Sequence, residues 1–353
     1  MLENPVPETA RPGPRNALTD VAGISVGSSA DPAVRSGVTV VRAEPSATAA
    51  VDTRGGAPGT RETDALDPSC LVERADAIVL SGGSVFGLDA AGVVTDWLAA
   101  RGQGFRLGTA PPCPIVPAAI VFDLSNGGAK DWGETSPYRR LGREACDSLG
   151  PEVVLGNAGA GFGALAGAWK GGLGTASTLT EDGITAAALV VVNSFGSPVD
   201  PRTGMLWAEP FLYPGDIPEH AFHGRWRRAP IPPDPTTGTK ASGPRTAGVH
   251  EPGTNTTIGV VACDAALGAA EARRVAIMAQ DGLARALRPA HSPVDGDTLF
   301  VLATGRRALP EPRPLALARL GTHAGDAAAR AIVRAVWEAK SIGEHRAYRP
   351  TEG

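Results

Sequence analysis

The sequence predicts an α/β protein in which helices pack against β-sheets, and two observations carry this prediction. Short apolar runs alternate along the chain with stretches of helical periodicity, which is typical of helices layered on sheets. The composition agrees, because 42% of the 353 residues are hydrophobic and 45 are glycine, as in globular proteins with many tight turns. A chain of this length can bury one large core or two smaller ones.

The first two thirds of the chain contribute two strands and a helix to this prediction. Residues 77–80 (Ala-Ile-Val-Leu) form a short continuous apolar run, which is typical of a buried strand. Residues 87–100 carry apolar side chains at helical spacing, which predicts a helix. Residues 187–192 (Ala-Ala-Leu-Val-Val-Val) predict a second buried strand, and this strand ends at Asn193.

The last third of the chain alternates strand and helix twice. Residues 258–262 predict a strand, and residues 264–287 predict a helix that ends before Pro289. Residues 298–304 predict another strand, and residues 325–340 predict a final amphipathic helix. Periodicity leaves open whether the strands are parallel or mixed.

Charge and hydropathy exclude several classes of partner. The formal net charge of −4 gives no basic surface for nucleic acid or for an anionic membrane. No apolar stretch reaches the roughly 18 residues expected of a membrane-spanning helix. Residues 1–15 are polar and proline-rich, which predicts a flexible tail rather than a signal peptide. We therefore expect a cytoplasmic protein that binds neither nucleic acid nor membranes.

Cysteine and histidine spacing argue against a metal centre. The four cysteines are scattered and show no C-x-x-C pair, which is expected of reduced thiols in the cytoplasm. The six histidines show no paired ligand spacing. We expect neither a metal ion nor an organic cofactor.

A proline-rich segment at residues 198–253 interrupts the pattern. It contains many prolines and several aromatic residues without a clear period, and loops of this length are usually functional or disordered. One interpretation is a linker. The other is that residues 233–254 become a free end after the chain is cut, and both interpretations stay open.

Directly after that segment, residues 253–261 (Gly-Thr-Asn-Thr-Thr-Ile-Gly-Val-Val) offer a site for a nucleophile. If the peptide bond before Thr256 were cut, Thr256 would carry a free α-amine beside its own hydroxyl. Such an amine has an ordinary pKa of about 7.7–8.0, so it can act as a base near neutral pH. One residue would then supply nucleophile and base. Taken alone, a Thr-Thr pair at a strand start more often indicates β-propensity.

Seven segments of the chain occur in a characteristic order. They are 54–64, 80–91, 116–124, 156–161 leading to 170–174, 190–193, 255–258 and 295–300. Together they resemble the DmpA-like self-processing aminopeptidases, which include β-peptidyl aminopeptidases and nylon-oligomer hydrolases. The resemblance runs from about Asn16 to the C-terminal helix. It implies a four-layer αββα sandwich of the N-terminal-nucleophile-hydrolase type.

The resemblance also implies how the chain is organised. Residues 16–353 would form a single catalytic domain that cuts itself between Asn255 and Thr256. The two fragments, 1–255 and 256–353, would stay packed together, and cleaved pairs would assemble into a homo-oligomer, often a tetramer. The Asn-Thr junction resembles the nylon-hydrolase branch.

Site residues follow from the same resemblance. Thr256 would be the nucleophile, Asn193 would stabilise the oxyanion, and Asp295 and Asp297 would orient the new α-amine. Taken alone, the Asp-Gly-Asp run is also typical of a turn before a strand, and a strand-ending Asn often begins a turn. Lys170 would fill a lysine position near the glycine run. A slip of two residues in the match puts Ala168 there instead, and Lys170 is then a solvated turn lysine.

One position departs from the family pattern. Phe122 stands where some relatives carry Tyr, and Phe cannot donate the hydrogen bond of a hydroxyl. Asn126, four residues on, is a speculative substitute. We interpret Gly82-Gly83-Ser84, which precede the first predicted helix, as residues that shape the backbone.

These observations predict a self-processing N-terminal-threonine hydrolase that needs no cofactor. Its substrates would be amide or ester bonds of small peptides, β-peptides or aminohexanoate oligomers. An acyltransferase and a non-catalytic ligand-binding member of the same fold remain alternatives. A further alternative is a dinucleotide-binding oxidoreductase, because residues 152–155 (Glu-Val-Val-Leu) imitate a strand that runs into glycines at 159–163, and Glu181 follows about 20 residues later.

Overall fold

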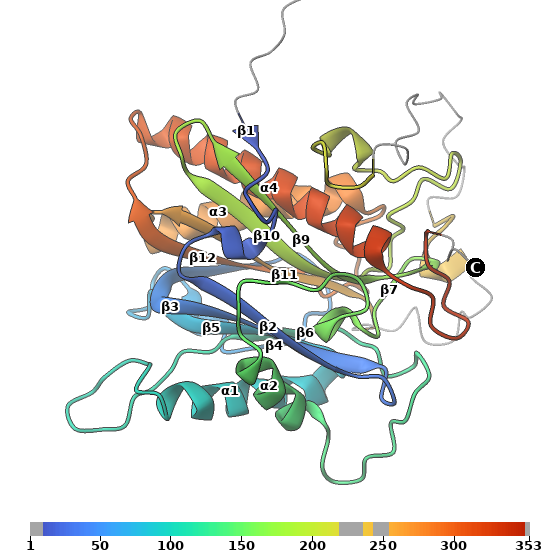
Figure 1. The fold of residues 1–353 in the computed structure, drawn as a ribbon, viewed down its shortest axis with the longest axis horizontal. Helices are drawn as coiled ribbons and strands as arrows, with labels where there is room; N and C mark the ends of the chain where they lie inside the picture. The colour runs from blue at the N-terminus through green and yellow to red at the C-terminus, as the bar shows by residue number, and fades with distance from the viewer. Residues whose placement is uncertain (1–9, 219–235, 243–253, 350–353) are drawn as a thin grey trace, which may run out of the picture.

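The computed structural model describes residues 10–218, 236–242 and 254–349, and their helices and strands form four layers (Figure 1). Two helices, α3 (Ala269–Ala286) and α4 (Arg313–Glu338), make one outer layer. The other outer layer holds α1 (Ala90–Ala99) and α2 (Tyr138–Asp147), and the strands lie between the two. This confirms the predicted αββα sandwich.

Ten strands of the described residues are mixed in direction and follow one continuous hydrogen-bonded order, β1-β9-β10-β11-β12-β3-β5-β6-β4, with β2 paired to β3, and β7 (Leu165–Ala166) and β8 (Trp169–Lys170) form a separate pair. Strands β11 and β12 run parallel to each other, and each has an antiparallel neighbour on its other side, β10 and β3. The strand bounds are β1 Ala10–Arg11, β2 Ile24–Asp31, β3 Ser36–Thr53, β4 Thr60–Arg61, β5 Arg74–Ser81, β6 Ala118–Ile120, β9 Gly172–Thr180, β10 Thr185–Asn193, β11 Thr256–Ala265 and β12 Thr298–Arg307.

Strand β3 joins the two inner layers, because it is long enough to pair in both. Its residues 36–43 pair with β2, and its residues 48–53 pair with β12. Its register with β5 shifts between Arg42 and Ala47. Pro45 lies inside that shift and has no N–H to give to a ladder, so it suits an irregular position.

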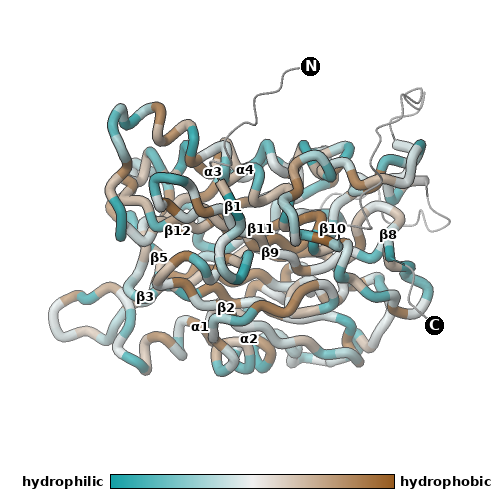
Figure 2. The backbone as a smooth tube through the Cα atoms, turned by 45° about the horizontal axis from the view of Figure 1, so that its top comes forward, coloured by the Kyte–Doolittle hydropathy of each residue, from teal (hydrophilic) through white to brown (hydrophobic). Residues whose placement is uncertain are grey.

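Three hydrophobic clusters fill the three spaces between the four layers. Strand β10 shows why its sequence is apolar without interruption. Val190 packs in the cluster with α3 and α4, whereas its neighbours Leu189 and Val191 pack between the two sheets. Alternate side chains of a strand point to opposite faces, and here both faces are buried. Figure 2 shows hydrophobic residues concentrated on these central strands.

The predicted strands are confirmed, and the predicted helices differ at their starts. The helix expected at 87–100 begins as a 3-10 helix, Ser84–Asp89, before α1. The helix expected from residue 264 begins at Ala269, because β11 continues to Ala265. The helix expected from residue 325 begins twelve residues earlier, at Arg313.

Part of the segment expected as a flexible tail belongs to the sheet. Ala10 and Arg11 form β1 and pair with β9, so the expected tail 1–15 is wrong for these two residues. Residues 1–9 lie outside the described residues, as do 219–235 and 243–253 of the proline-rich segment. Whether 233–254 is a linker or a free end therefore remains a prediction.

Candidate active site

Thr256 and Asn193 lie side by side at one end of the central strands. Thr256 is the first residue of β11, and Asn193 is the last residue of β10. Because the two strands are antiparallel, the start of one is opposite the end of the other, and Asn193 pairs directly with Thr256. Both residues are buried, with 1% of each exposed.

The peptide bond before Thr256 has two hydrogen-bond donors on its carbonyl oxygen. The Thr256 hydroxyl donates to the carbonyl oxygen of Asn255, and the Gly296 N–H donates to the same oxygen at 2.9 Å. The nucleophile predicted for self-cleavage therefore lies at the carbonyl group that it would attack. The Gly296 N–H lies where negative charge would develop on that oxygen.

Asp297 holds the backbone on both sides of the site. One carboxylate oxygen accepts the N–H of Thr257 at 2.7 Å. The other accepts the N–H of His291 at 3.0 Å and lies 2.9 Å from the Nδ1 atom of the same histidine. Asp297 is 1% exposed, so these bonds replace the water that an exposed carboxylate would bind.

Asp295 is the second buried carboxylate of the acidic turn. It accepts the N–H of Phe195 at 3.0 Å with one oxygen, and the N–H and hydroxyl of Ser292 with the other. Its backbone forms a bridge with Asn255, which places it at the junction. Burial raises the pKa of Asp295 above its ordinary value, and the charge of Asp297 adds to this. The Ser292 and Phe195 hydrogen bonds act in the opposite direction.

The Asn193 amide is held in one orientation. Its Oδ1 atom accepts the N–H of Leu165 at 2.9 Å, and its Nδ2 atom donates to the carbonyl oxygen of Phe122 at 3.0 Å. The backbone N–H of Leu165 can only donate, so Oδ1 must face it, and Nδ2 faces the Phe122 carbonyl oxygen as the donor. Phe122 thus contacts Asn193 through its backbone. The Asn126 amide nitrogen instead donates to the carbonyls of Arg35 and Gly163.

Lys170 is buried, so its interpretation as a solvated turn lysine is wrong. It lies in β8 (Trp169–Lys170), and its ammonium group donates to the carbonyls of Gly161, Ala164 and Gly171 at 2.9–3.2 Å. The peptide group that joins Ala164 to Leu165 gives its carbonyl to Lys170 and its N–H to Asn193. Lys170 therefore lies one peptide group away from Asn193.

Lys170 makes stability depend on pH. Burial lowers the pKa of Lys170 from 10.5 to about 7, and the Asp123 charge acts in the opposite direction. Between pH 7 and 10 the unfolded state binds a proton that the folded state does not, so stability rises with pH by up to about 1.4 kcal/mol per unit. We expect the Lys170→Met variant to show a slope smaller by this amount in urea unfolding between pH 6.5 and 9. The exposed Lys340→Met variant should keep the full slope, and equal slopes in both variants would contradict the assignment.

Gly82, Gly83 and Ser84 shape the backbone, as predicted from the sequence. Gly83 has a φ of +81°, and its N–H donates to Asp123 at 2.8 Å. A Cβ atom at Gly83 would lie 1.9 Å from the Tyr138 ring, so a side chain does not fit there.

The dinucleotide-binding alternative is wrong. It requires a strand at 152–155 that runs into a glycine-rich turn and a helix. The structure has no strand at 152–155, and Gly159–Gly161 form one 3-10 turn, followed by β7 (Leu165–Ala166) rather than a helix.

Three residues of the site were not predicted from the sequence. Gly296 donates its N–H to the Asn255 carbonyl oxygen at the junction, and His291 contacts the Asp297 carboxylate. Lys240 donates from its side chain to Asn193, although it belongs to the proline-rich segment. A weak signal existed for Lys240, because it is one of only four lysines in the chain.

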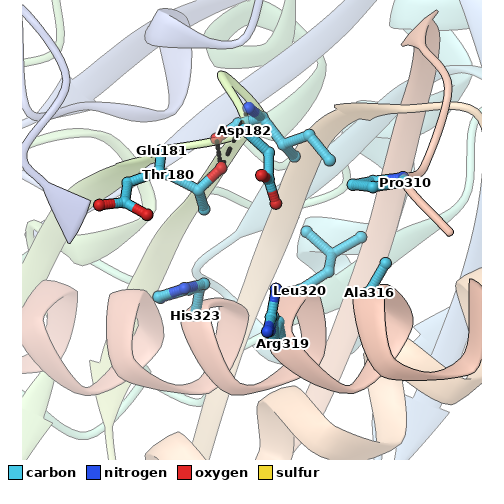
Figure 3. Close-up of a pocket in the computed structure, with 9 residues that line it drawn as sticks. Thr180, Glu181, Asp182, Pro310, Ala316, Arg319, Leu320 and His323 are labelled. Atoms are coloured by element: carbon cyan, nitrogen blue, oxygen red, sulfur yellow. Dashed lines mark hydrogen bonds between the residues drawn. The ribbon is translucent and has the colours of Figure 1, made fainter. Parts of the chain in front are cut away.

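A separate cavity of about 250 Å³ lies at the other end of the sheet (Figure 3). It is enclosed by the turn between β9 and β10 and by α4, and Asp182, Arg319 and His323 line it. Strand β10 separates this end from Asn193 by eight residues, or roughly 26 Å. The cavity is therefore not part of the Thr256 site.

Residues 10–218, 236–242 and 254–349 contain no cluster of three His, Cys, Asp or Glu side chains arranged to hold a metal ion. None of the helices in the same ranges is long and apolar enough to cross a membrane.

Comparisons with known proteins agree with this geometry. The model of peptidase family S58 matches residues 16–348. An uncharacterized aminopeptidase of Mycobacterium tuberculosis is 43% identical over 351 residues, which cover 95% of this chain and 97% of the relative. A 6-aminohexanoate-oligomer endohydrolase of Kocuria sp. is 29% identical over 348 residues, which cover 91% of this chain and 89% of the relative.

The fold also has solved counterparts. The L-aminopeptidase D-Ala-esterase/amidase of Ochrobactrum anthropi, whose structure is described as a variant of the Ntn hydrolase fold, matches with a TM-score of 0.65 at 20% identity. The match covers 95% of this chain and 89% of that one. The resemblance drawn from the seven sequence segments is thus confirmed. The chain belongs to peptidase family S58, and it is a hydrolase with the fold of the N-terminal-nucleophile hydrolases.

Proposed function

We propose that this chain cuts itself between Asn255 and Thr256 and then uses the freed Thr256 to hydrolyse amide bonds of small molecules that carry a free amino group. The observation that carries the proposal is the junction itself. A buried threonine hydroxyl and the Gly296 N–H meet at one peptide carbonyl, with Asp295 and Asp297 on either side of Gly296.

Self-cleavage would proceed in two steps. The Thr256 hydroxyl oxygen attacks the carbonyl carbon of Asn255, while the Gly296 N–H stabilises the oxyanion. The C–N bond breaks, the hydroxyl proton passes to the departing nitrogen, and an ester links Asn255 to Thr256. Water then hydrolyses the ester, which leaves a carboxylate on Asn255 and a free amine and hydroxyl on Thr256.

The mature site would repeat this chemistry on a substrate. The Thr256 α-amine takes the hydroxyl proton as the oxygen attacks the substrate carbonyl, and it gives that proton to the leaving amine. The acyl group remains on Thr256 as an ester until water, deprotonated by the same α-amine, releases it. We assign the stabilisation of the oxyanion to the Asn193 Nδ2 group, because Asn193 pairs directly with Thr256.

The acidic turn points to the substrate class. Buried carboxylates favour a cationic partner, and a protonated amino group is such a partner. We infer that Asp295 and Asp297 hold the Thr256 α-amine and that the net negative charge around them favours substrates with a free amino group. Short peptides, β-peptides and aminohexanoate oligomers carry such a group at one end, and the aminopeptidase activity named for the mycobacterial relative fits this description.

An intact-mass measurement on freshly purified protein tests the first half of the proposal. We expect two species, of roughly 26 and 10 kDa for 255 and 98 residues at about 100 Da per residue. The smaller one should begin with threonine. A single species of 36.0 kDa that persists on incubation would overturn self-cleavage.

A pair of substrates tests the second half. A short peptide p-nitroanilide with a free amino group should be hydrolysed, and the same compound with an acetylated amino group should not. Equal turnover of both would show that the free amino group plays no part in recognition.

Gly296→Ala should slow self-cleavage by on the order of 100-fold, because a 1 Å displacement at a reacting group costs about that much. A Cβ atom there would lie 2.9 Å from the Thr256 hydroxyl oxygen and 2.7 Å from the carbonyl oxygen of Ala57, so the nucleophile must move. The cleaved fraction is followed by mass spectrometry during cell-free synthesis. Gly150→Ala is the matched control, since its nearest neighbour would be 3.9 Å away. Equal cleavage rates in the two variants would contradict the predicted crowding.

We also propose that cleaved pairs assemble into a tetramer in the cytoplasm. Leu71, Phe105 and Leu107 are more than half exposed, which supports a contact surface. Cys70 and Cys113 are exposed and unpaired, which suits a reducing compartment. Light scattering coupled to gel filtration should give four times 36.0 kDa, and a monomer would overturn the assembly.

A further inference from the structure

Lys240 brings an ammonium group from the proline-rich segment to Asn193. It begins the short 3-10 turn Lys240–Ser242, and its backbone N–H donates to the carbonyl of Phe195 at 3.2 Å. Its Nζ atom donates to the backbone carbonyl of Asn193 at 3.1 Å and lies 3.4 Å from the Oδ1 atom of the same residue. One lysine thus contacts both the backbone and the side chain of the strand end that faces Thr256.

These contacts bear on which way the Asn193 amide faces. Its Oδ1 atom has the Leu165 N–H on one side and the Lys240 ammonium group on the other. If the amide were flipped, its NH₂ group would face two donors and lose both hydrogen bonds. Lys240 therefore favours the orientation in which Nδ2 donates one hydrogen to the Phe122 carbonyl and keeps its second hydrogen for the reacting carbonyl.

The charge of Lys240 also complements the acidic turn. Burial lowers the pKa of Lys240 to about 7, whereas the nearby Asp295 carboxylate favours its charged form. Asp297, with His291 against it, adds negative charge to the same region. Before the chain is cut, the nitrogen of Thr256 is an uncharged amide, so it cannot balance these carboxylates.

We propose that Lys240 is a positioning residue of the Thr256 site, which fixes the Asn193 amide and balances the Asp295 carboxylate while Thr256 is still in peptide linkage. This inference rests on the function proposed above. It gives the proline-rich segment a task in the uncut chain, because Lys240 lies only fifteen residues before the junction.

The test compares Lys240→Met, Lys240→Gln and Lys240→Arg with the wild-type chain. Self-cleavage is timed by mass spectrometry during cell-free synthesis. Hydrolysis of a free-amino p-nitroanilide is then measured and normalised to the cleaved fraction. We expect Lys240→Met to lower the cleavage rate and kcat by roughly 10- to 100-fold, since a displaced oxyanion donor costs about this much. KM should change less than about twofold, and Lys240→Arg should recover part of the loss.

A double-mutant cycle shows whether Lys240 acts through Asn193. Asn193→Ala alone should be impaired, and adding Lys240→Met to it should cost little more, because the group that Lys240 orients is already gone. An activated ester substrate keeps the rates of these variants measurable. If the two losses simply multiply, Lys240 does not act through Asn193 and the proposal is overturned.

Two controls separate this outcome from others. Lys130→Met removes another partly buried lysine that donates to a backbone carbonyl, that of Val34, and it should leave both rates unchanged. Thermal unfolding midpoints of all Lys240 variants are measured alongside. Rate losses that merely follow the loss of midpoint across the three variants would overturn the positioning role.

Wild-type and Lys240→Met rates together distinguish a wrong role for Lys240 from a wrong proposed function. If wild-type protein cuts itself and hydrolyses the substrate while Lys240→Met does so at the same rates, only the role of Lys240 is overturned. If the wild-type chain does neither, the proposed function falls, and the role of Lys240 falls with it.

Discussion

Replacing Thr256 by alanine should leave the chain as a single species of 36.0 kDa and remove amide hydrolysis. Alanine has no hydroxyl to attack the Asn255 carbonyl, so neither the ester nor the free α-amine can form. The hydrolysis rate should fall by about 10⁴-fold or more, as when a nucleophile is removed from other covalent hydrolases. Intact mass and turnover of a free-amino p-nitroanilide measure the two effects.

Thr257 provides a matched control for this variant. It is the next residue on β11, equally buried, and its hydroxyl has no hydrogen-bond partner among the described residues. Thr257→Val keeps the shape and the backbone N–H that Asp297 binds, so it should be cut and active. Thr256→Ser should retain part of both reactions because it keeps the hydroxyl. Cleavage of Thr256→Ala at the wild-type rate would refute Thr256 as the nucleophile.

Replacing Asp216 by alanine should destabilise the fold by about 3–5 kcal/mol, because it leaves the charge of Arg330 buried without its partner. The Arg330 side chain is 0% exposed and contacts both oxygens of Asp216, at 2.7 and 2.8 Å. Its remaining donors bind Asn16, Ser177 and Thr178. Denaturant unfolding of the Thr256→Ala background, which stays in one piece, measures the loss.

The surface pair Asp96 and Arg139 is the matched control. Its atoms lie 3.2 Å apart, but its side chains are 72% and 49% exposed. Exposed pairs contribute about 1 kcal/mol or less, so Asp96→Ala should change stability little. Asp216→Ala combined with Arg330→Met should recover part of the loss, because the buried charge is then removed. If Asp216→Ala and Asp96→Ala lower the free energy of unfolding by similar amounts, the buried pair of Asp216 and Arg330 does not stabilise the fold as its burial predicts.

The strands could be predicted because burial on both faces gives an uninterrupted apolar run in the sequence. Helix starts were harder to predict, since a residue there can begin the helix or make a contact in the preceding strand. Asp264 suits the first turn of a helix, yet it lies on β11 and accepts the N–H of Thr185 at 2.9 Å. The helix starts after Gly268 instead, where Glu271 accepts the Gly268 N–H at 3.0 Å. The hydrogen bond between Asp264 and Thr185 of the neighbouring strand therefore outweighs the local preference of Asp264 for a helix start.

Two glycines explain why the sequence did not predict the first half of α4. Gly321 and Gly325 lower the helical preference of that stretch by about 1 kcal/mol each, so its period looked broken. In the structure a Cβ atom at Gly321 would lie 2.3 Å from Met278, and one at Gly282 would lie 2.2 Å from the Gly325 carbonyl. These glycines let α3 and α4 pack closely, which only the tertiary structure reveals.

Some residues of the candidate site could also be predicted from the sequence, and others could not. Thr256, Asn193, Asp295 and Asp297 could be proposed because they stand in segments with a family pattern, and the structure brings them together. Lys240 could not, since its segment has no period and its partner Asn193 is 47 residues away. Only the folded chain shows that contact.

The position of β11 and β12 in the sheet has a consequence for refolding. Both strands follow residue 255, yet they lie between β10 and β3, which precede it. In the uncut chain this arrangement forms by a unimolecular reaction. After the proposed cut, the same arrangement requires two separate polypeptides to meet. Recovery of the mature protein from denaturant should therefore depend on concentration, whereas recovery of the Thr256→Ala chain should not.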